Sequence, residues 1–165
     1  HRVDRRQRQM CIRDRSQIPL IIGGGGKVKT PTLAGKYSEE FNIYAGPKET
    51  LQNSINLFKA VASENGRDEK ALEITTACPP VVGLTKESVD NSLITAAKAL
   101  IQPKDEIAKN WKERSYLFGT PEDVVKTLSM WQEVGIEAVY LQLLDLEPSK
   151  RDESVEVIQK AINLL

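Results

Sequence analysis

The stretch Pro19-Leu20-Ile21-Ile22-Gly23-Gly24-Gly25-Gly26-Lys27 decides the fold of this chain. A short apolar run ends in four glycines, and a lysine follows. An all-apolar strand is typical of a parallel sheet that is buried on both faces. Glycine lets the backbone adopt positive φ and approach a ligand closely, and successive backbone N–H groups then form a concavity for an anion. The pattern therefore predicts an α/β protein with a phosphate-binding turn.

The glycine turn is not one of the sharply defined nucleotide motifs. It matches neither the GxGxxG fingerprint nor the loop that ends in Gly-Lys-Ser/Thr. A helix is expected to begin at Thr30-Pro31, with Thr30 as its cap, and its positive end adds to the attraction for an anion. Lys27 and Lys29 then neutralise the bound charge. The alternative is a flexible turn with solvated lysines and no ligand.

The rest of the chain alternates between strands and helices. Further strands are expected at 41–45, 72–83 and 136–144, the second of them broken or at a sheet edge at Pro79-Pro80. Apolar residues at helical spacing mark the buried helix faces. These are Leu33 and Tyr37; Leu51, Ile55, Phe58 and Ala62; Val124, Leu128 and Trp131; and Val155, Ile158, Ile162 and Leu165. Four strand–helix units in strict alternation predict a parallel α/β sheet.

Composition limits the classes of function. A chain of 165 residues forms one domain with a real core. No apolar run of about 18 residues exists, so no membrane partner is expected. Cys11 and Cys78 lie far apart, which suits a reducing compartment and predicts neither a disulfide framework nor a metal site. We therefore expect a cytoplasmic protein without a metal.

Residues 1–16 are strongly basic. They hold six arginines and two aspartates, whereas the rest of the chain has an excess of four acidic residues. A basic arm is one feature of nucleic-acid binding, but this segment has no aromatic residue and no periodicity. The string at 10–15, Met-Cys-Ile-Arg-Asp-Arg, resembles translated sequencing adapter. We interpret residues 1–16 as a non-native or disordered arm, expect no nucleic-acid partner, and assign the domain to 17–165.

Three blocks within residues 17–165 carry a resemblance to a known family. The first is Pro19-Leu-Ile-Ile-Gly-Gly-Gly-Gly26, followed by Thr30, Leu33, Ala34, Tyr37 and Phe41-Asn42-Ile43. The second is Glu64-Asn-Gly-Arg-Asp68, which precedes a strand. The third is Phe118-Gly-Thr-Pro-Glu-Asp-Val-Val125, followed by Gly135-Ile-Glu-Ala-Val-Tyr-Leu-Gln142. In this order and spacing they resemble the C-terminal half of luciferase-like monooxygenases, which are flavin- and deazaflavin-dependent barrel enzymes.

The resemblance implies a fold and a cofactor site. The four strands would be the last four of a TIM-type (β/α)8 barrel, with a helical excursion at about 84–118. In the family, the glycine turn after the fifth strand contacts the cofactor phosphate through backbone amides. Carried over, this gives Gly24, Gly25 and Gly26, with Lys27 as charge partner, in keeping with the use of late βα loops for phosphate in barrels.

The resemblance also implies an activity. It indicates an oxidoreductase that performs hydride transfer or monooxygenation on a small-molecule substrate and forms a homodimer at full length. The four-glycine turn is closest to members that use coenzyme F420, and FMN is the alternative. A complete barrel takes about 250 residues, and the family's catalytic acids and histidine have no counterpart here. We therefore expect a truncated chain that is inactive alone, with catalytic residues unknown.

Two other classes of function stay open. One is a non-redox phosphate-binding barrel enzyme, although an aldolase would need a strand-end lysine and none is evident. The other is a half-barrel that acts as a dimeric binding protein for a phosphorylated ligand.

A few further polar residues lie at or near strand ends. Asp145 and Gln142 follow the last strand on the face where barrel ligands bind, although a solvated acid is the simpler interpretation. Thr75 and Thr76 lie mid-strand, so one of them could point into the barrel, although packing in the core or the strand ladder is the expected role. Cys78 has no neighbouring histidine or lysine in the sequence and is interpreted as a buried, inert small residue.

Overall fold

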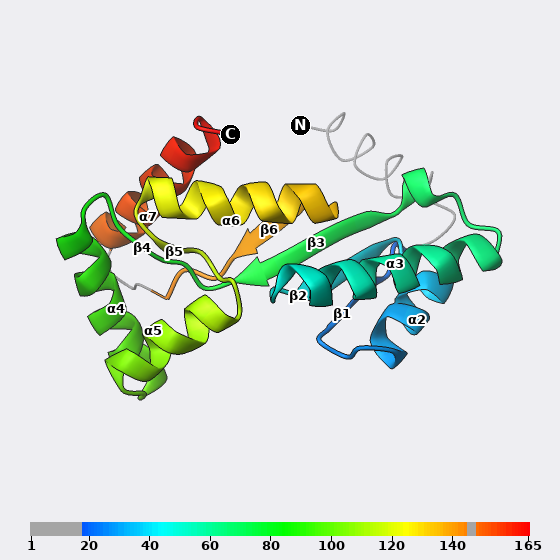
Figure 1. Ribbon diagram of the computed structural model, residues 1–165, viewed down its shortest axis with the longest axis horizontal. Helices are drawn as coiled ribbons and strands as arrows, with labels where there is room; N and C mark the ends of the chain where they lie inside the picture. The colour runs from blue at the N-terminus through cyan, green and yellow to red at the C-terminus, as the bar shows by residue number, and fades with distance from the viewer. Residues whose placement is uncertain (1–17, 145–147) are drawn as a thin grey trace, which may run out of the picture.

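The computed structural model describes residues 18–144 and 148–165, and its centre is a four-stranded parallel sheet (Figure 1). The strand order is β1-β2-β3-β6, and every neighbouring pair is parallel. The bounds are Ile21–Gly24 for β1, Glu40–Tyr44 for β2, Glu73–Cys78 for β3 and Ala138–Leu141 for β6. The parallel α/β sheet expected from the alternation of strands and helices is confirmed.

The side chains of strand β2 show that one face of the sheet is buried and the other is partly exposed. Phe41 and Ile43 are buried against the helices, whereas Asn42 is half-buried and Tyr44 is exposed on the opposite face. In the register, Asn42 lies between Gly23 of β1 and Thr75 of β3. We call the side that carries Gly23, Asn42, Thr75 and Ala138 the open face of the sheet. The other side meets the helices and forms the core.

Four helices follow one another around the helix-covered side, in the order α2, α3, α6 and α7. Their bounds are Lys29–Tyr37, Lys48–Glu64, Pro121–Val134 and Pro148–Ile162. The apolar stripe expected on α3 is confirmed, since Leu51, Ile55, Phe58 and Ala62 are all buried. Gly135 ends α6 in the left-handed conformation, at φ 92°. None of the described helices is long and apolar enough to cross a membrane.

Helix α2 differs from its prediction in both its start and its buried face. It begins at Lys29, and the capping position is Val28, so Thr30 is not the cap. Leu33 and Tyr37 are about half exposed, and the buried residues are Pro31, Ala34 and Gly35. The reason is a close approach between α2 and α3, in which a Cβ on Gly35 would lie 2.6 Å from the Phe58 carbonyl oxygen. Small residues permit this contact, and larger ones turn outward.

Helix α7 also buries a different stripe from the one predicted. Val155, Ile162 and Leu165 are exposed, although Ile158 is buried as expected. The inward positions are Ser154, Val157, Ile158 and Ala161. Small side chains on this face bring the helix close to its neighbours, whereas periodicity by itself selects the largest apolar residues.

The chain leaves the main sheet at Pro79-Pro80, because proline cannot donate to a strand ladder. Strand β4, Val81–Val82, pairs in parallel with β5, Phe118–Gly119, in a separate two-stranded sheet. Between them lie α4, Lys86–Leu100, and α5, Lys104–Glu113; the short helix η1, Glu69–Ala71, precedes β3. A second core of Val81, Leu93, Ala96, Ile107 and Trp111 supports α4 and α5.

The close approach of α2 and α3 predicts that Gly35→Ala is destabilising. The new Cβ would meet backbone at 2.6 Å and the Val61 Cβ at 2.9 Å, so overpacking outweighs the gain in helix propensity. We expect a net loss of about 1–2 kcal/mol in the free energy of unfolding, measured by urea denaturation. Gly46→Ala is the control, because nothing lies within 4 Å of a Cβ there. Equal stability of the two variants would contradict the packing argument.

Candidate functional site

The carboxyl ends of the parallel strands meet at one edge of the sheet. Gly24, Tyr44, Cys78 and Leu141 are the last residues of the four strands. Ligands of α/β proteins bind outside this edge, at the loops that follow the strands. The loop between β1 and α2, residues 25–28, lies there, and all four of its residues are exposed. The structure therefore presents the glycine turn where a ligand can reach it.

The glycine turn passes between two side chains that leave no room for a Cβ. Gly24 has φ +148°, which strains any other residue. A Cβ on Gly26 would lie 2.5 Å from Thr30 Oγ1, and one on Gly25 would lie 2.9 Å from Tyr44 Cδ2. The turn therefore presents bare backbone between the start of α2 and the end of β2.

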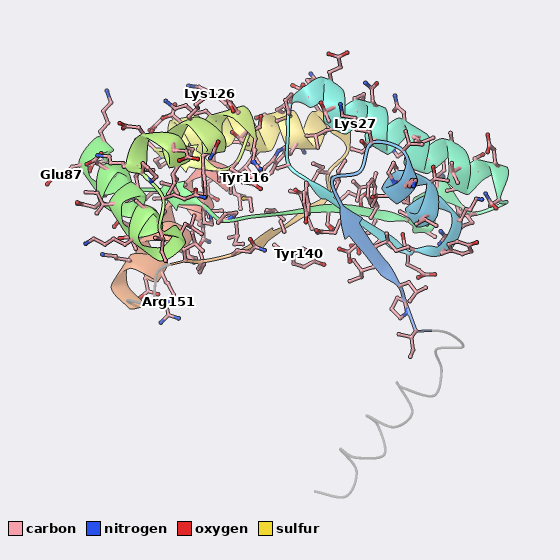
Figure 2. All side chains as sticks on the ribbon, turned by 90° about the horizontal axis from the view of Figure 1, so that it is seen from below. Lys27, Glu87, Tyr116, Lys126, Tyr140 and Arg151 are labelled. Atoms are coloured by element: carbon pink, nitrogen blue, oxygen red, sulfur yellow. The ribbon has the colours of Figure 1, made fainter. Side chains whose placement is uncertain are left out.

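The start of α2 gives this edge a positive potential. Val28 makes no side-chain cap, and the first turn of the helix has no acidic residue, so its N–H groups and dipole act on the glycine turn. Lys27 and Lys29 are exposed, and neither forms an ion pair with another described residue. Figure 2 shows Lys27 beside the loop that joins β1 to α2. Bare backbone, a helix N-terminus and two free ammonium groups together suit an anion.

Of the four predicted site residues, Gly24 ends β1, and Gly25, Gly26 and Lys27 lie in the loop that follows it. Gln142 follows β6 at the same edge of the sheet, and its backbone N–H donates to the Cys78 carbonyl over 3.0 Å. Asp145 lies outside the described residues, as does the basic arm at 1–16.

Cys78 ends β3 with its side chain in the core. Burial raises the pKa of its thiol to about 11, although a backbone hydrogen bond to Leu117 acts in the opposite direction. A thiol with so high a pKa is protonated near neutral pH and is a poor nucleophile. The interpretation of Cys78 as a buried small residue is confirmed.

A polar network on the open face was not predicted. The Thr75 hydroxyl donates to Glu40 Oε1 over 2.5 Å, and the Asn42 amide donates to Thr75 Oγ1 over 2.8 Å. The Tyr140 hydroxyl donates to Glu40 Oε2 over 3.2 Å. In Figure 2, Tyr140 lies on the side of the sheet opposite α3. The available signal was the alternation of Glu40, Asn42 and Tyr44 with apolar residues along β2.

The network compensates a buried carboxylate. Glu40 is only 7% exposed, and each of its oxygens accepts one O–H. Burying a charge without such partners is costly. The hydrogen bond to Glu40 in turn raises the pKa of Tyr140, because the nearby negative charge disfavours the phenolate.

The network predicts a titration shift. Tyr140 should ionise above the ordinary tyrosine pKa of about 10, and Glu40→Gln should lower that pKa by removing the negative charge beside the hydroxyl. Absorbance of phenolate against pH measures this, with Tyr140→Phe identifying the contribution of Tyr140. Glu137→Gln is the control, because Glu137 directly precedes β6, the strand that carries Tyr140. The network is contradicted if Glu40→Gln and Glu137→Gln give the same curve.

Cys78 provides a second test. In a Cys11→Ser background, we expect the native thiol to resist a disulfide reagent at pH 8, because burial both blocks access and keeps it protonated. Labelling should follow unfolding and should become complete in denaturant. Rapid labelling of the folded protein, measured by mass spectrometry, would place Cys78 outside the core.

Comparison with known proteins relates this geometry to a family. The sequence profile of the luciferase-like monooxygenase family matches residues 1–138. Among solved structures, an F420-dependent secondary alcohol dehydrogenase in complex with an F420–acetone adduct is similar, with a TM-score of 0.64 and 22% identity. The alignment covers 88% of this chain and 49% of that one. No curated protein sequence matches the chain.

Two further solved structures show the same relation. The coenzyme F420-dependent tetrahydromethanopterin reductase from Methanopyrus kandleri has a TM-score of 0.63 and 14% identity, over 89% of this chain and 51% of that one. A long-chain alkane monooxygenase has a TM-score of 0.59 and 17% identity, and the alignment covers 86% of this chain and 40% of that one. The chain thus spans about half the length of these barrel proteins or less, and its fold is that of a half-barrel.

Proposed function

Because the chain belongs to the luciferase-like monooxygenase family, we propose that it is the cofactor-binding half of an oxidoreductase that uses coenzyme F420, with reduced FMN as the alternative. The observation that carries this proposal is the exposed glycine turn at the carboxyl edge of the sheet, next to the uncapped start of α2. Two of the similar structures are named as F420-dependent enzymes. The cofactor, when bound, supplies hydride transfer or oxygen activation.

The residues of the turn fit a phosphate group of such a cofactor. Any side chain at Gly25 or Gly26 would meet Tyr44 or Thr30, so only glycine leaves the backbone N–H groups accessible from the solvent side. Lys27 and Lys29 add charge without an internal carboxylate partner among the described residues. The role of this chain is then to hold the phosphate end of the cofactor and to orient the rest over the barrel mouth.

We also propose that catalysis on a small-molecule substrate requires the other four βα units of a barrel, so this chain is inactive alone. The described carboxyl edge offers a turn for binding, and its one cysteine, Cys78, is buried and protonated. In the complete enzyme, which we propose is a homodimer, this half holds the cofactor while the acids and bases come from elsewhere.

The proposal is tested by filling the turn. Gly25→Val should weaken binding of coenzyme F420 more than tenfold, since the added side chain would collide with Tyr44, whose Cδ2 lies 2.9 Å from the new Cβ, and would displace the turn. Lys27→Ala should weaken it by about tenfold, which is the loss of one charge-assisted hydrogen bond. Fluorescence titration of the deazaflavin measures both.

Control experiments distinguish a loss of binding at the turn from a general effect of changing the charge of the protein. Lys36→Ala removes a lysine at the other end of α2 and should leave affinity unchanged. Titration with FMN decides between the two cofactors. If inorganic phosphate competes fully and the ring adds no affinity, the non-redox phosphate-binding alternative is favoured. Unchanged affinity of Gly25→Val would remove the turn from the site.

A further inference from the structure

A cavity of about 470 Å³ lies between α5, β5 and α6. All of its lining residues fall between positions 112 and 130, so neither end of the chain contributes to it. Its volume is within the range of ligand cavities, about 300–1,000 Å³. Figure 2 shows Lys126 on the helix-covered side of the sheet, opposite to Tyr140. The cavity is therefore separate from the glycine turn and from the polar network of the open face.

The wall at the end of α5 is held in place by contacts within the chain. Ser115 adopts a left-handed φ of 50°, and its backbone N–H donates to the Lys112 carbonyl over 3.1 Å. The Tyr116 ring packs edge-on against Trp111, with ring centroids 5.4 Å apart. Trp111 is only 5% exposed, and its indole N–H donates to the Pro79 carbonyl over 2.7 Å. A ligand would thus meet a preformed wall, which lowers the ordering cost of binding.

Three hydroxyl groups at the cavity have no partner in the part of the chain that the structure describes. They belong to the half-buried residues Ser115, Tyr116 and Thr127. On the same helix as Thr127, the Ser129 hydroxyl donates to the Val125 carbonyl over 2.8 Å, which is a common partner for a helical hydroxyl. The three cavity hydroxyls are therefore available to a ligand.

The cavity also holds one positive charge that no described carboxylate balances. Lys126 Nζ lies 3.2 Å from Asp123 Oδ1, so these two charges compensate each other. Lys112 forms no ion pair within residues 18–144 and 148–165, and its Nζ lies 5.4 Å from the centroid of the Phe118 ring. The lining thus combines a single net positive charge, free hydroxyls and an aromatic surface.

We propose that this cavity binds an aromatic carboxylate. The carboxylate would accept charge-assisted hydrogen bonds from Lys112 and the free hydroxyls, and the ring would lie against Phe118 and Met130. A single negative charge matches the one unbalanced ammonium group, and a ring fills the apolar part that a small inorganic anion leaves empty. The site shares no residue with the glycine turn, so it is tested independently of the proposed cofactor.

The first experiment titrates 2-naphthoate into the full chain by isothermal titration calorimetry. Lys112→Met should weaken binding at least tenfold, because a charge-assisted hydrogen bond is lost. Lys109→Met is the matched control, since this exposed lysine of the same helix pairs with Glu113 and does not line the cavity. The neutral 2-naphthamide should bind at least tenfold more weakly than the acid. Absence of binding at millimolar 2-naphthoate, or equal affinities of the two lysine variants, would overturn the proposal.

Methyl NMR locates the probe without altering the cavity. The chain has two methionines, Met10 and Met130, and Met130 lines the cavity. With the methionine methyl groups labelled and Met10→Leu used for assignment, the ring current of 2-naphthoate should move the Met130 signal as binding saturates. Excess inorganic phosphate, which suits the glycine turn, should not compete. Saturation with an unmoved Met130 signal, or full competition by phosphate, would place the probe elsewhere and refute the site.

Discussion

Parallel pairing of β1, β2, β3 and β6 is the constraint on which the rest of this structure depends. Because the four strands share one direction, their carboxyl ends lie at a single edge. Because they also follow one another in chain order across the sheet, right-handed connections all cross over the same side. The helices therefore cover one face, and the loops that could hold a ligand gather at one end. Reversing β1 would move the glycine turn away from the carboxyl end of β2, its neighbour in the sheet.

The register of that pairing also decides where charge is buried. Asn42 of β2 lies opposite Thr75 of β3, and this places the Thr75 hydroxyl within reach of Glu40. A shift of one residue would turn Glu40 toward Phe58 and the other core side chains, where it would lose its donors. The polar network and the apolar core thus stabilise the same register from opposite faces.

Strand β1 is subject to two structural constraints. The glycines that follow it, Gly25 and Gly26, must stay free of side chains so that the turn passes between Thr30 and Tyr44. Its outer edge lacks a strand partner among the described residues. A short strand rich in glycine has few side-chain contacts with which to stabilise an edge. On α2, which packs against β1, Leu33 and Tyr37 are about half exposed.

The amino-acid sequence by itself determined the order of the four main strands, the parallel sheet, the break at Pro79-Pro80 and the position of the glycine turn, but not the separate pairing of β4 with β5. These follow from local rules: apolar periodicity, proline chemistry and the properties of glycine. It also determined the buried stripe of α3, where Leu51, Ile55 and Phe58 are all large.

Only the tertiary structure decided which face α2 and α7 bury, and which polar residues meet. On α2, Gly35 packs against α3 because a side chain there would collide with the Phe58 carbonyl, so Leu33 and Tyr37 turn outward. Glu40 and Tyr140 are 100 residues apart and meet through strand register. Sequence periodicity records the size and spacing of side chains, whereas close helix approach and cross-strand contacts depend on distances that only the folded chain sets.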